Sequence, residues 1–432
     1  MEYLKQSYLL KIQYCLFWLL GLTCAASCLA IKIGASQIAI YNIPIVLIAV
    51  LCICFKNFYL DKNRLLFALL LLLMIFSNLF SILDVPDDWF NYGFSYSLKL
   101  IILIFPICFC LSNINISKML EGFLRGIKVS CIIWLIWEVL QIIVFYNVGV
   151  SLNEIIFEYI LGLESGRPSM LLLGENMDEA TFRPTGLSWD PAYLGMILSF
   201  GYILWDNKYL KICFIIGAIL STSRTGFILM IIAIIMDFFY KHKYKLNSNI
   251  SLRSLLCLLI VFITFIITII IFYDNIINII SVQMQHISFD FFNGSKASNM
   301  SDNIHALYYI NIFDIFFNSN NPIKFLLGQG YMEVGYFYAL EYGLYGIVNP
   351  WNPESDFVIL FIGCGVLGTS IYYFIMYKAL KNKNSFCKSI LILLLTGGIF
   401  YIFLRSTWTI ILLLLIFLSK DVPLKKNNKK DI

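Results

Sequence analysis

The feature that most constrains this chain is a series of long apolar runs that recur along almost its whole length. A helix needs roughly 20 apolar residues to cross a bilayer core about 30 Å thick. Within lipid, a helix satisfies its own backbone hydrogen bonds, whereas a loop does not. The composition agrees, because 60% of the residues are hydrophobic and only 13% are charged. The sequence therefore excludes a single soluble core and predicts an all-α polytopic membrane protein.

The apolar runs define about twelve predicted membrane-spanning helices. In chain order they cover residues 13–31, 38–55, 65–82, 95–112, 127–146, 191–205, 211–221, 225–240, 254–273, 355–377, 388–404 and 406–419. The sixth, seventh, eleventh and twelfth runs are short or crowded together, so we expect tilted or broken helices there.

The distribution of charge orients these helices. Lys and Arg collect in the cytoplasmic loops of membrane proteins, and most of the 31 basic residues fall on one side if the N-terminus is cytoplasmic. The C-terminus then lies in the cytoplasm as well. The predicted parts are helices 1 to 5 at 1–146, a first long external loop at 147–190, helices 6 to 9 at 191–273, a second long external loop at 274–354, helices 10 to 12 at 355–419, and a basic cytoplasmic tail at 420–432. Loops of such length commonly carry function.

The sequence carries no pattern for a cofactor or a metal. Its 12 cysteines lie in or beside apolar runs and are interpreted as small hydrophobic residues. Its 3 histidines lack the carboxylate spacing of a zinc site. Neither a phosphate-binding Gly-rich loop, nor a dinucleotide fingerprint, nor a serine-hydrolase elbow is present in the sequence. ATP-driven transport, redox chemistry and serine hydrolysis therefore lack support.

Three arginines lie where predicted spans meet the external face. Arg183 begins a polar segment that leads into a span, Arg224 lies in a Ser-Thr-Ser-Arg-Thr-Gly turn, and Arg405 breaks the apolar run near the C-terminus. A guanidinium binds phosphate well, because its planar fork donates two hydrogen bonds and stays charged. We interpret all three as candidate phosphate-binding residues. The alternatives are, respectively, an arginine that pairs with a loop carboxylate, an arginine that snorkels to the interface, and a plain turn.

Two carboxylates lie where the second long loop re-enters the membrane. Glu354 and Asp356 stand just before a span that is rich in glycine. Either could accept a proton from a sugar hydroxyl, which is the task of a general base in glycosyl transfer. The alternative is a cap at the positive end of a helix. Asp190, at the start of another span, is more simply interpreted as such an N-cap.

The order and spacing of these motifs resemble the O-antigen polymerase (Wzy) family, which is related to the O-antigen ligases. The residues that carry the resemblance are Arg183-Pro184-Thr185-Gly186 with Asp190-Pro191 and Gly195, Ser221-Thr222-Ser223-Arg224-Thr225-Gly226, Gly328-Gln329-Gly330, and Glu354-Ser355-Asp356 before Gly363-Cys364-Gly365-Val366-Leu367-Gly368. The number of spans and the two long external loops agree with that family.

The resemblance implies a metal-independent membrane glycosyltransferase of the bacterial inner membrane, with no cofactor. Such an enzyme polymerises undecaprenyl-pyrophosphate-linked oligosaccharide repeat units at the periplasmic face during lipopolysaccharide biosynthesis. Arg183 and Arg224 match the external arginines that contact the lipid-linked substrate, and Arg405 is a further candidate. A chain-length regulator and a flippase of the same pathway are the implied protein partners, and nucleic acid is not a partner.

The chemistry of the candidate residues supports glycosyl transfer independently of the family resemblance. A pyrophosphate leaving group is already activated, so catalysis mainly requires cations for the departing charge and a base for the incoming hydroxyl. Two alternatives stay open. An O-antigen ligase transfers finished chains, and it usually shows a His-Asn pair where this chain has Glu354-Ser355-Asp356. A transporter or flippase of lipid-linked oligosaccharide should expose charges along a route within the membrane, where Glu138 is the clear mid-span charge.

Overall fold

The computed structural model describes residues 2–33, 36–54, 58–81, 84–111, 113–162, 171–173, 181–243, 309, 312, 321–342 and 353–419. Within them the chain is mostly helical, as the apolar runs predict. The chain divides into two compact units, one made of residues 1–234 with 315–432 and the other of residues 235–314. The predicted span 254–273, most of the second long loop and the tail at 420–432 lie outside the described residues.

A helix stands at every predicted span that lies within the described residues. The helices are α1 (Glu2–Thr23), α2 (Asn42–Cys54), α3 (Lys62–Phe80), α4 (Asp87–Lys99), α5 (Phe105–Cys110), α6 (Asn113–Val148), α7 (Pro191–Leu204), α8 (Lys208–Leu220), α9 (Arg224–Lys243), α14 (Pro322–Leu327), α15 (Val334–Tyr342), α16 (Asp356–Gly363), α17 (Gly365–Asn382), α18 (Ser385–Phe400) and α19 (Thr407–Leu418). Two π-helical segments, η2 (Leu100–Ile104) and η3 (Glu154–Ile160), and two antiparallel hairpins, β1 (Ala30–Ile33) with β2 (Ser36–Ala39) and β3 (Leu171–Leu173) with β4 (Thr181–Arg183), complete the described elements.

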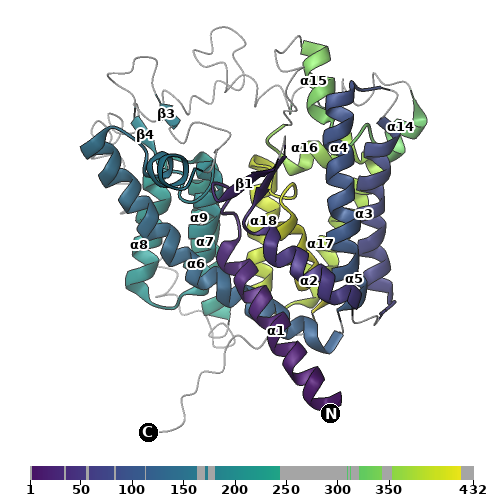
Figure 1. Cartoon of the computed structure of the whole chain (residues 1–432), viewed down its shortest axis with the longest axis horizontal. Helices are drawn as coiled ribbons and strands as arrows, with labels where there is room; N and C mark the ends of the chain where they lie inside the picture. The colour runs from purple at the N-terminus through teal and green to yellow at the C-terminus, as the bar shows by residue number, and fades with distance from the viewer. Residues whose placement is uncertain are drawn as a thin grey trace, which may run out of the picture. The chain divides into compact units, whose positions relative to one another are not determined.

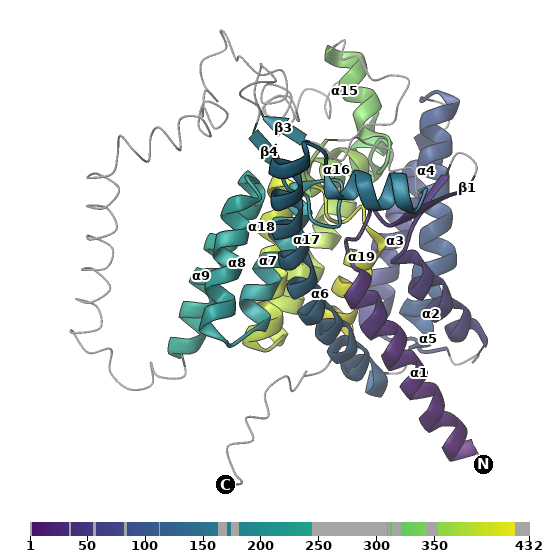
Figure 2. The ribbon, with the colours of Figure 1, turned by 60° about the vertical axis from the view of Figure 1, so that its left-hand side comes forward.

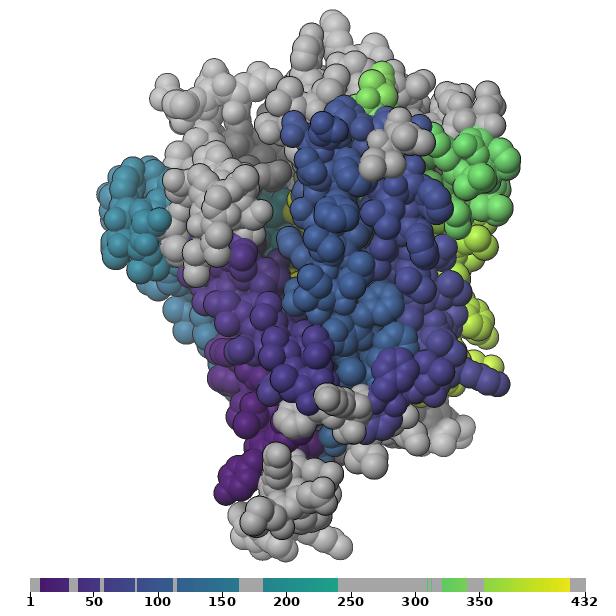
Figure 3. Space-filling view, turned by 45° about the vertical axis from the view of Figure 1, so that its right-hand side comes forward, coloured from purple at the N-terminus to yellow at the C-terminus, as the bar shows by residue number. Residues whose placement is uncertain are grey.

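Several helices present apolar side chains outward. The stretches 62–80, 87–110 and 115–148 are long and apolar enough to cross a membrane. On α3 the exposed apolar residues recur at helical spacing, at Leu65, Leu69, Leu72, Phe76 and Phe80. Figure 3 shows a face of the molecule to which α3 and α4, in blue, and α1 and α2, in purple, contribute. An outward apolar stripe of this length suits lipid rather than water, which supports a membrane protein.

The C-terminal helix α19 lies at the centre of the larger unit. All of its residues are buried, since it is apolar on every side, and it contacts α2, α3 and α6. In Figures 1 and 2, α3 to α5 lie on one side of α17 and α18, and α7 and α8 lie on the other. The long helix α6 also packs along α1.

The span predicted at 355–377 is broken in the structure. It ends as α16 and resumes as α17, with Cys364 between them. The backbone amides of Gln329 and Gly330 donate to the carbonyls of Ile362, at 2.9 Å, and Gly363, at 3.2 Å. These bonds satisfy carbonyl groups that the end of α16 leaves without a helical partner. The sequence predicted breaks at other spans and missed this one, which depends on a segment more than thirty residues away.

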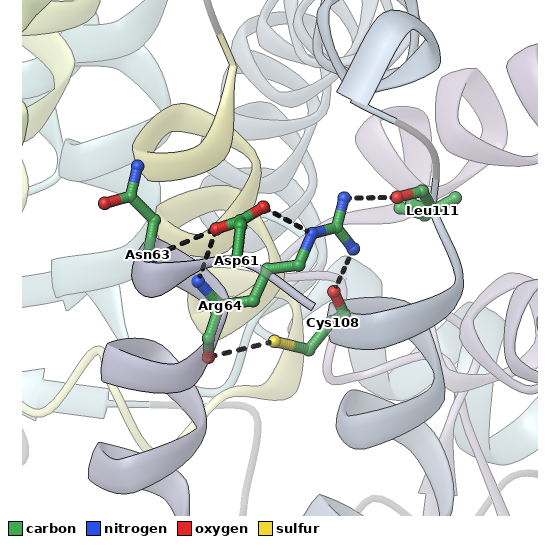
Figure 4. A network of polar contacts seen from close by, with 5 residues as sticks. All are labelled: Asp61, Asn63, Arg64, Cys108 and Leu111. Carbon is green, nitrogen blue, oxygen red and sulfur yellow. Dashed lines mark hydrogen bonds and ion pairs between the residues drawn. The ribbon is translucent and has the colours of Figure 1, made fainter. Parts of the chain in front are cut away.

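The start of α3 is fastened to the end of α5 by Arg64, whose side chain is fully buried (Figure 4). Its Nε donates to Asp61 Oδ2 at 3.0 Å, and its two terminal nitrogens donate to the carbonyls of Cys108 and Leu111. Those carbonyls lie at the C-terminal end of α5, where a helix lacks backbone donors and favours a cation. Arg64 therefore acts as a structural cap.

Candidate functional site

Arg183 reaches the turn between α8 and α9. Its Nε donates to Thr222 Oγ1 and its Nη2 donates to the Thr222 carbonyl, each at 3.2 Å. Thr222 has a φ of +50°, which is uncommon for a β-branched residue and marks a constrained turn. Two segments that the sequence identified separately therefore meet, and one candidate arginine holds the turn that carries the other.

Arg224 is the first residue of α9, and its side chain is exposed. The Ser223 hydroxyl accepts a hydrogen bond from the Gly226 amide at 3.1 Å and so caps this helix. A helix N-terminus carries partial positive charge, so Arg224 adds a full cation where the backbone already favours an anion. A Cβ on Gly195 would lie 2.2 Å from the Gly226 Cα, so α7 and α9 approach through glycine.

The segment that follows Arg183 is anchored at Gly186. This residue has a φ of +64°, and a Cβ there would lie 2.6 Å from the Trp134 ring. Gln141 of α6 binds it twice, because the Gly186 amide donates to Gln141 Oε1 at 2.9 Å and Gln141 Nε2 donates to the Gly186 carbonyl at 3.2 Å. Asn153 Nδ2 donates to the same carbonyl at 2.9 Å. Neither Gln141 nor Asn153 belongs to a recognisable motif, so these two contacts were not predicted from the sequence.

Asp190 is the N-cap of α7, as the sequence predicted. Its Oδ1 accepts from the Ala192 amide at 2.8 Å. One helical turn into α7, the Tyr193 hydroxyl donates to the Ile402 carbonyl at 3.2 Å and lies 2.7 Å from Ser406 Oγ. The start of α7 therefore contacts the turn at residues 401–406, between α18 and α19.

Arg405 lies in that 401–406 turn with its side chain exposed. Its Cζ lies 5.2 Å from the centre of the Tyr92 ring, a cation–π distance. The phenols of Tyr41, Tyr193 and Tyr401 lie within electrostatic range of the guanidinium. These rings come from four separate segments and combine apolar faces with hydroxyl groups. Together with the cation they suit a ligand that has both sugar rings and negative charge.

The two predicted carboxylates occupy different surroundings. Glu354 is half-buried and lies within electrostatic range of Tyr401. Asp356 is only 3% exposed, and its Oδ1 accepts from the Leu404 amide at 2.9 Å. The cap of α16 is Ser355, whose hydroxyl accepts from the Val358 amide at 3.4 Å. Neither carboxylate is therefore the residue that caps this helix.

A third carboxylate, Glu333, was not predicted from the sequence. It stands between α14 and α15 in the chain, outside the predicted spans, and its side chain is fully buried. Gly93 and Gly330 pack against it, because a Cβ on either glycine would lie 2.2 Å from one of the Glu333 oxygens. Burial raises the pKa of Glu333 to about 8, and the negative charge of Asp84 adds to this shift. A carboxyl in this setting favours its neutral form at neutral pH.

The fold defines a helical membrane protein in which Arg183 meets the turn before Arg224 and Arg405 lies beside the Tyr92 ring. Residues 209–373 match the family model described as O-antigen ligase. This segment includes Arg224, Glu354 and Asp356, and the match confirms the resemblance to the O-antigen polymerases and ligases. None of the curated proteins matches the chain. Among the described residues, no group of three or more His, Cys, Asp or Glu side chains could hold a metal ion.

Proposed function

We propose that this chain is a membrane glycosyltransferase that polymerises undecaprenyl-pyrophosphate-linked oligosaccharide repeat units into O-antigen or a related surface polysaccharide. The observation that carries the proposal is the meeting of the Arg183 and Arg224 segments through Thr222, in a chain similar to the O-antigen ligase family over residues 209–373. The proposal places this site at the periplasmic face of the inner membrane, with about twelve spans and both termini in the cytoplasm.

In the proposed reaction the arginines stabilise the leaving group. Arg183 and Arg224 bind the donor pyrophosphate, and Arg405 assists, so that negative charge is met as the bond between the sugar and the pyrophosphate breaks. Glu354 or Asp356 removes the proton from the acceptor hydroxyl, whose oxygen forms the new glycosidic bond. Tyr401, which lies within electrostatic range of Glu354, offers a ring face to a sugar. The products are a longer lipid-linked chain and free undecaprenyl pyrophosphate.

An O-antigen ligase is the second candidate, because the matching family model carries that description. Both activities use the same donor and the same leaving group, and they differ in the acceptor. A polymerase uses another lipid-linked repeat unit as acceptor, whereas a ligase uses a lipid A core. The absence of a His-Asn pair at residues 354–356 favours the polymerase.

A gel of surface lipopolysaccharide from a strain that lacks this gene separates the two candidates. We expect core carrying a single repeat unit, and a restored ladder in the complemented strain. Bare core with long lipid-linked chains would identify a ligase. An unchanged ladder would exclude both and would bring the transport alternative forward.

A further inference from the structure

The 401–406 turn, which presents Arg405, is held by side chains from distant helices. Asp356, at the start of α16, accepts from the Leu404 amide at 2.9 Å. Tyr96 of α4 donates its hydroxyl to the Leu404 carbonyl at 3.0 Å. Both backbone polar groups of the residue before Arg405 are thus bonded to buried side chains.

The other side of the turn is held from α7. The Tyr193 hydroxyl donates to the Ile402 carbonyl and lies within hydrogen-bond distance of Ser406 Oγ. Three helices therefore hold the backbone before Arg405, and α7 also contacts the Ser406 side chain after it, while the arginine side chain itself stays exposed. A cation that must meet charge as it develops works best when its position is fixed in advance.

The surroundings of Asp356 do not suit a general base. Its Oδ1 accepts from the Leu404 amide, and its Oδ2 faces Gly398, where a Cβ would lie 2.8 Å from that oxygen. A general base must come within hydrogen-bond reach of the substrate hydroxyl. With 3% exposure, Asp356 is enclosed by protein on both oxygens, whereas Glu354 is half-buried.

We infer that Asp356 is a positioning residue, which together with Tyr96 and Tyr193 holds residues 401–406 so that Arg405 faces the pyrophosphate of the lipid-linked substrate. This inference rests on the function proposed above. It resolves the choice between the two carboxylates by giving the proton transfer to Glu354 and the support of the turn to Asp356.

Two substitutions at one position separate support from proton transfer. Asp356→Asn keeps an oxygen that can accept from the Leu404 amide, but it cannot take up a proton at neutral pH. Asp356→Ala removes both abilities. With purified lipid-linked repeat units as substrate, we expect Asp356→Asn to polymerise within about threefold of the parent chain, because one neutral hydrogen bond replaces a stronger one. We expect Asp356→Ala to lose activity on the order of 10²-fold, because a displaced catalytic group is costly.

A substitution of Tyr193 tests the support that α7 gives to the same turn. Tyr193→Phe removes the hydroxyl but keeps the ring, and the loss of one net hydrogen bond predicts a decrease of up to about tenfold. Combined with Asp356→Ala it should add little, because both act on one turn. Tyr14→Phe is the matched control, since the Tyr14 ring packs on α6 against Gly122, away from the turn, and its activity should stay unchanged.

The outcome is scored per folded protein, with the amount in membranes and the unfolding temperature measured for each variant. If Asp356→Asn is as inactive as Asp356→Ala, Asp356 transfers a proton and the positioning role is wrong. If instead Arg405→Ala leaves polymerisation unchanged, the assignment of Arg405 in the proposed function fails. The two failures are therefore distinguishable.

Discussion

Arg64 and Arg405 use the same side chain in opposite ways. The Arg64 guanidinium is fully buried, and its donors are taken by Asp61 and by two carbonyls at the end of α5 (Figure 4). The Arg405 side chain is exposed beside the Tyr92 ring, and its backbone turn is held by other residues. One arginine supports the fold with its own side chain, whereas the other is supported by the fold.

The difference separates structural from functional cations in a membrane protein. Burying a charge is costly unless it is paired and hydrogen-bonded, so Arg64 is committed to its partners. An exposed guanidinium whose position is fixed by its neighbours keeps donors for a ligand. Substitutions of the first kind should lower stability, and substitutions of the second kind should lower activity.

The largest effect on stability is expected at Arg64. Arg64→Ala leaves the carbonyls of Cys108 and Leu111 without their donor, and each buried polar group left unsatisfied costs about 1–3 kcal/mol. Thermal unfolding of the detergent-purified protein measures the loss. Arg125→Ala is the control, because the Arg125–Glu121 pair is an exposed i,i+4 bridge, for which we expect a change within about 0.5 kcal/mol. Equal effects at both positions would contradict the comparison.

Arg224→Ala should lower activity without lowering stability. The loss of one cation at the leaving group predicts a decrease in polymerisation on the order of 10² to 10³-fold, while the exposed side chain carries little folding energy. The ladder of surface lipopolysaccharide and the unfolding temperature are measured together. An unchanged chain length would remove Arg224 from the site.

Gly186→Ala should lower both stability and activity. Its φ of +64° and the nearby Trp134 ring leave no room for a methyl group, and such strain costs on the order of 1–3 kcal/mol. Because Gln141 and Asn153 hold the same residue, the displacement should also reduce activity by shifting Arg183. Full activity in this variant would show that Arg183 needs no such support.

A pH dependence of stability is expected at Glu333, whose pKa burial raises from 4.5 to about 8. Below pH 4.5, Glu333 is protonated in both the folded and the unfolded chain. Between the two values the unfolded chain is ionised while the folded chain keeps its proton, so stability falls as pH rises and levels off above the higher value. Glu333→Gln should flatten the dependence of stability on pH. Above pH of about 8, this variant should be more stable than the parent chain. An unchanged slope would show that Glu333 does not titrate there.

Much of the helical fold could be predicted from the sequence, because an apolar run is a local signal. The structure has helices at the predicted spans that it describes, and it confirms the N-cap at Asp190. The meeting of Arg183 with Thr222 could not be predicted, since it joins residues from separate elements. The same holds for the break at Cys364 and for Arg64. Each depends on backbone groups distant in sequence, for which no motif exists.

The most direct test of the account uses the purified chain in lipid vesicles supplied with undecaprenyl-pyrophosphate-linked repeat units alone. We expect longer lipid-linked chains and release of undecaprenyl pyrophosphate, both strongly reduced by Arg224→Ala in a protein that unfolds at the same temperature as the parent. A vesicle preparation that contains folded protein and intact substrate but forms no longer chain would contradict it.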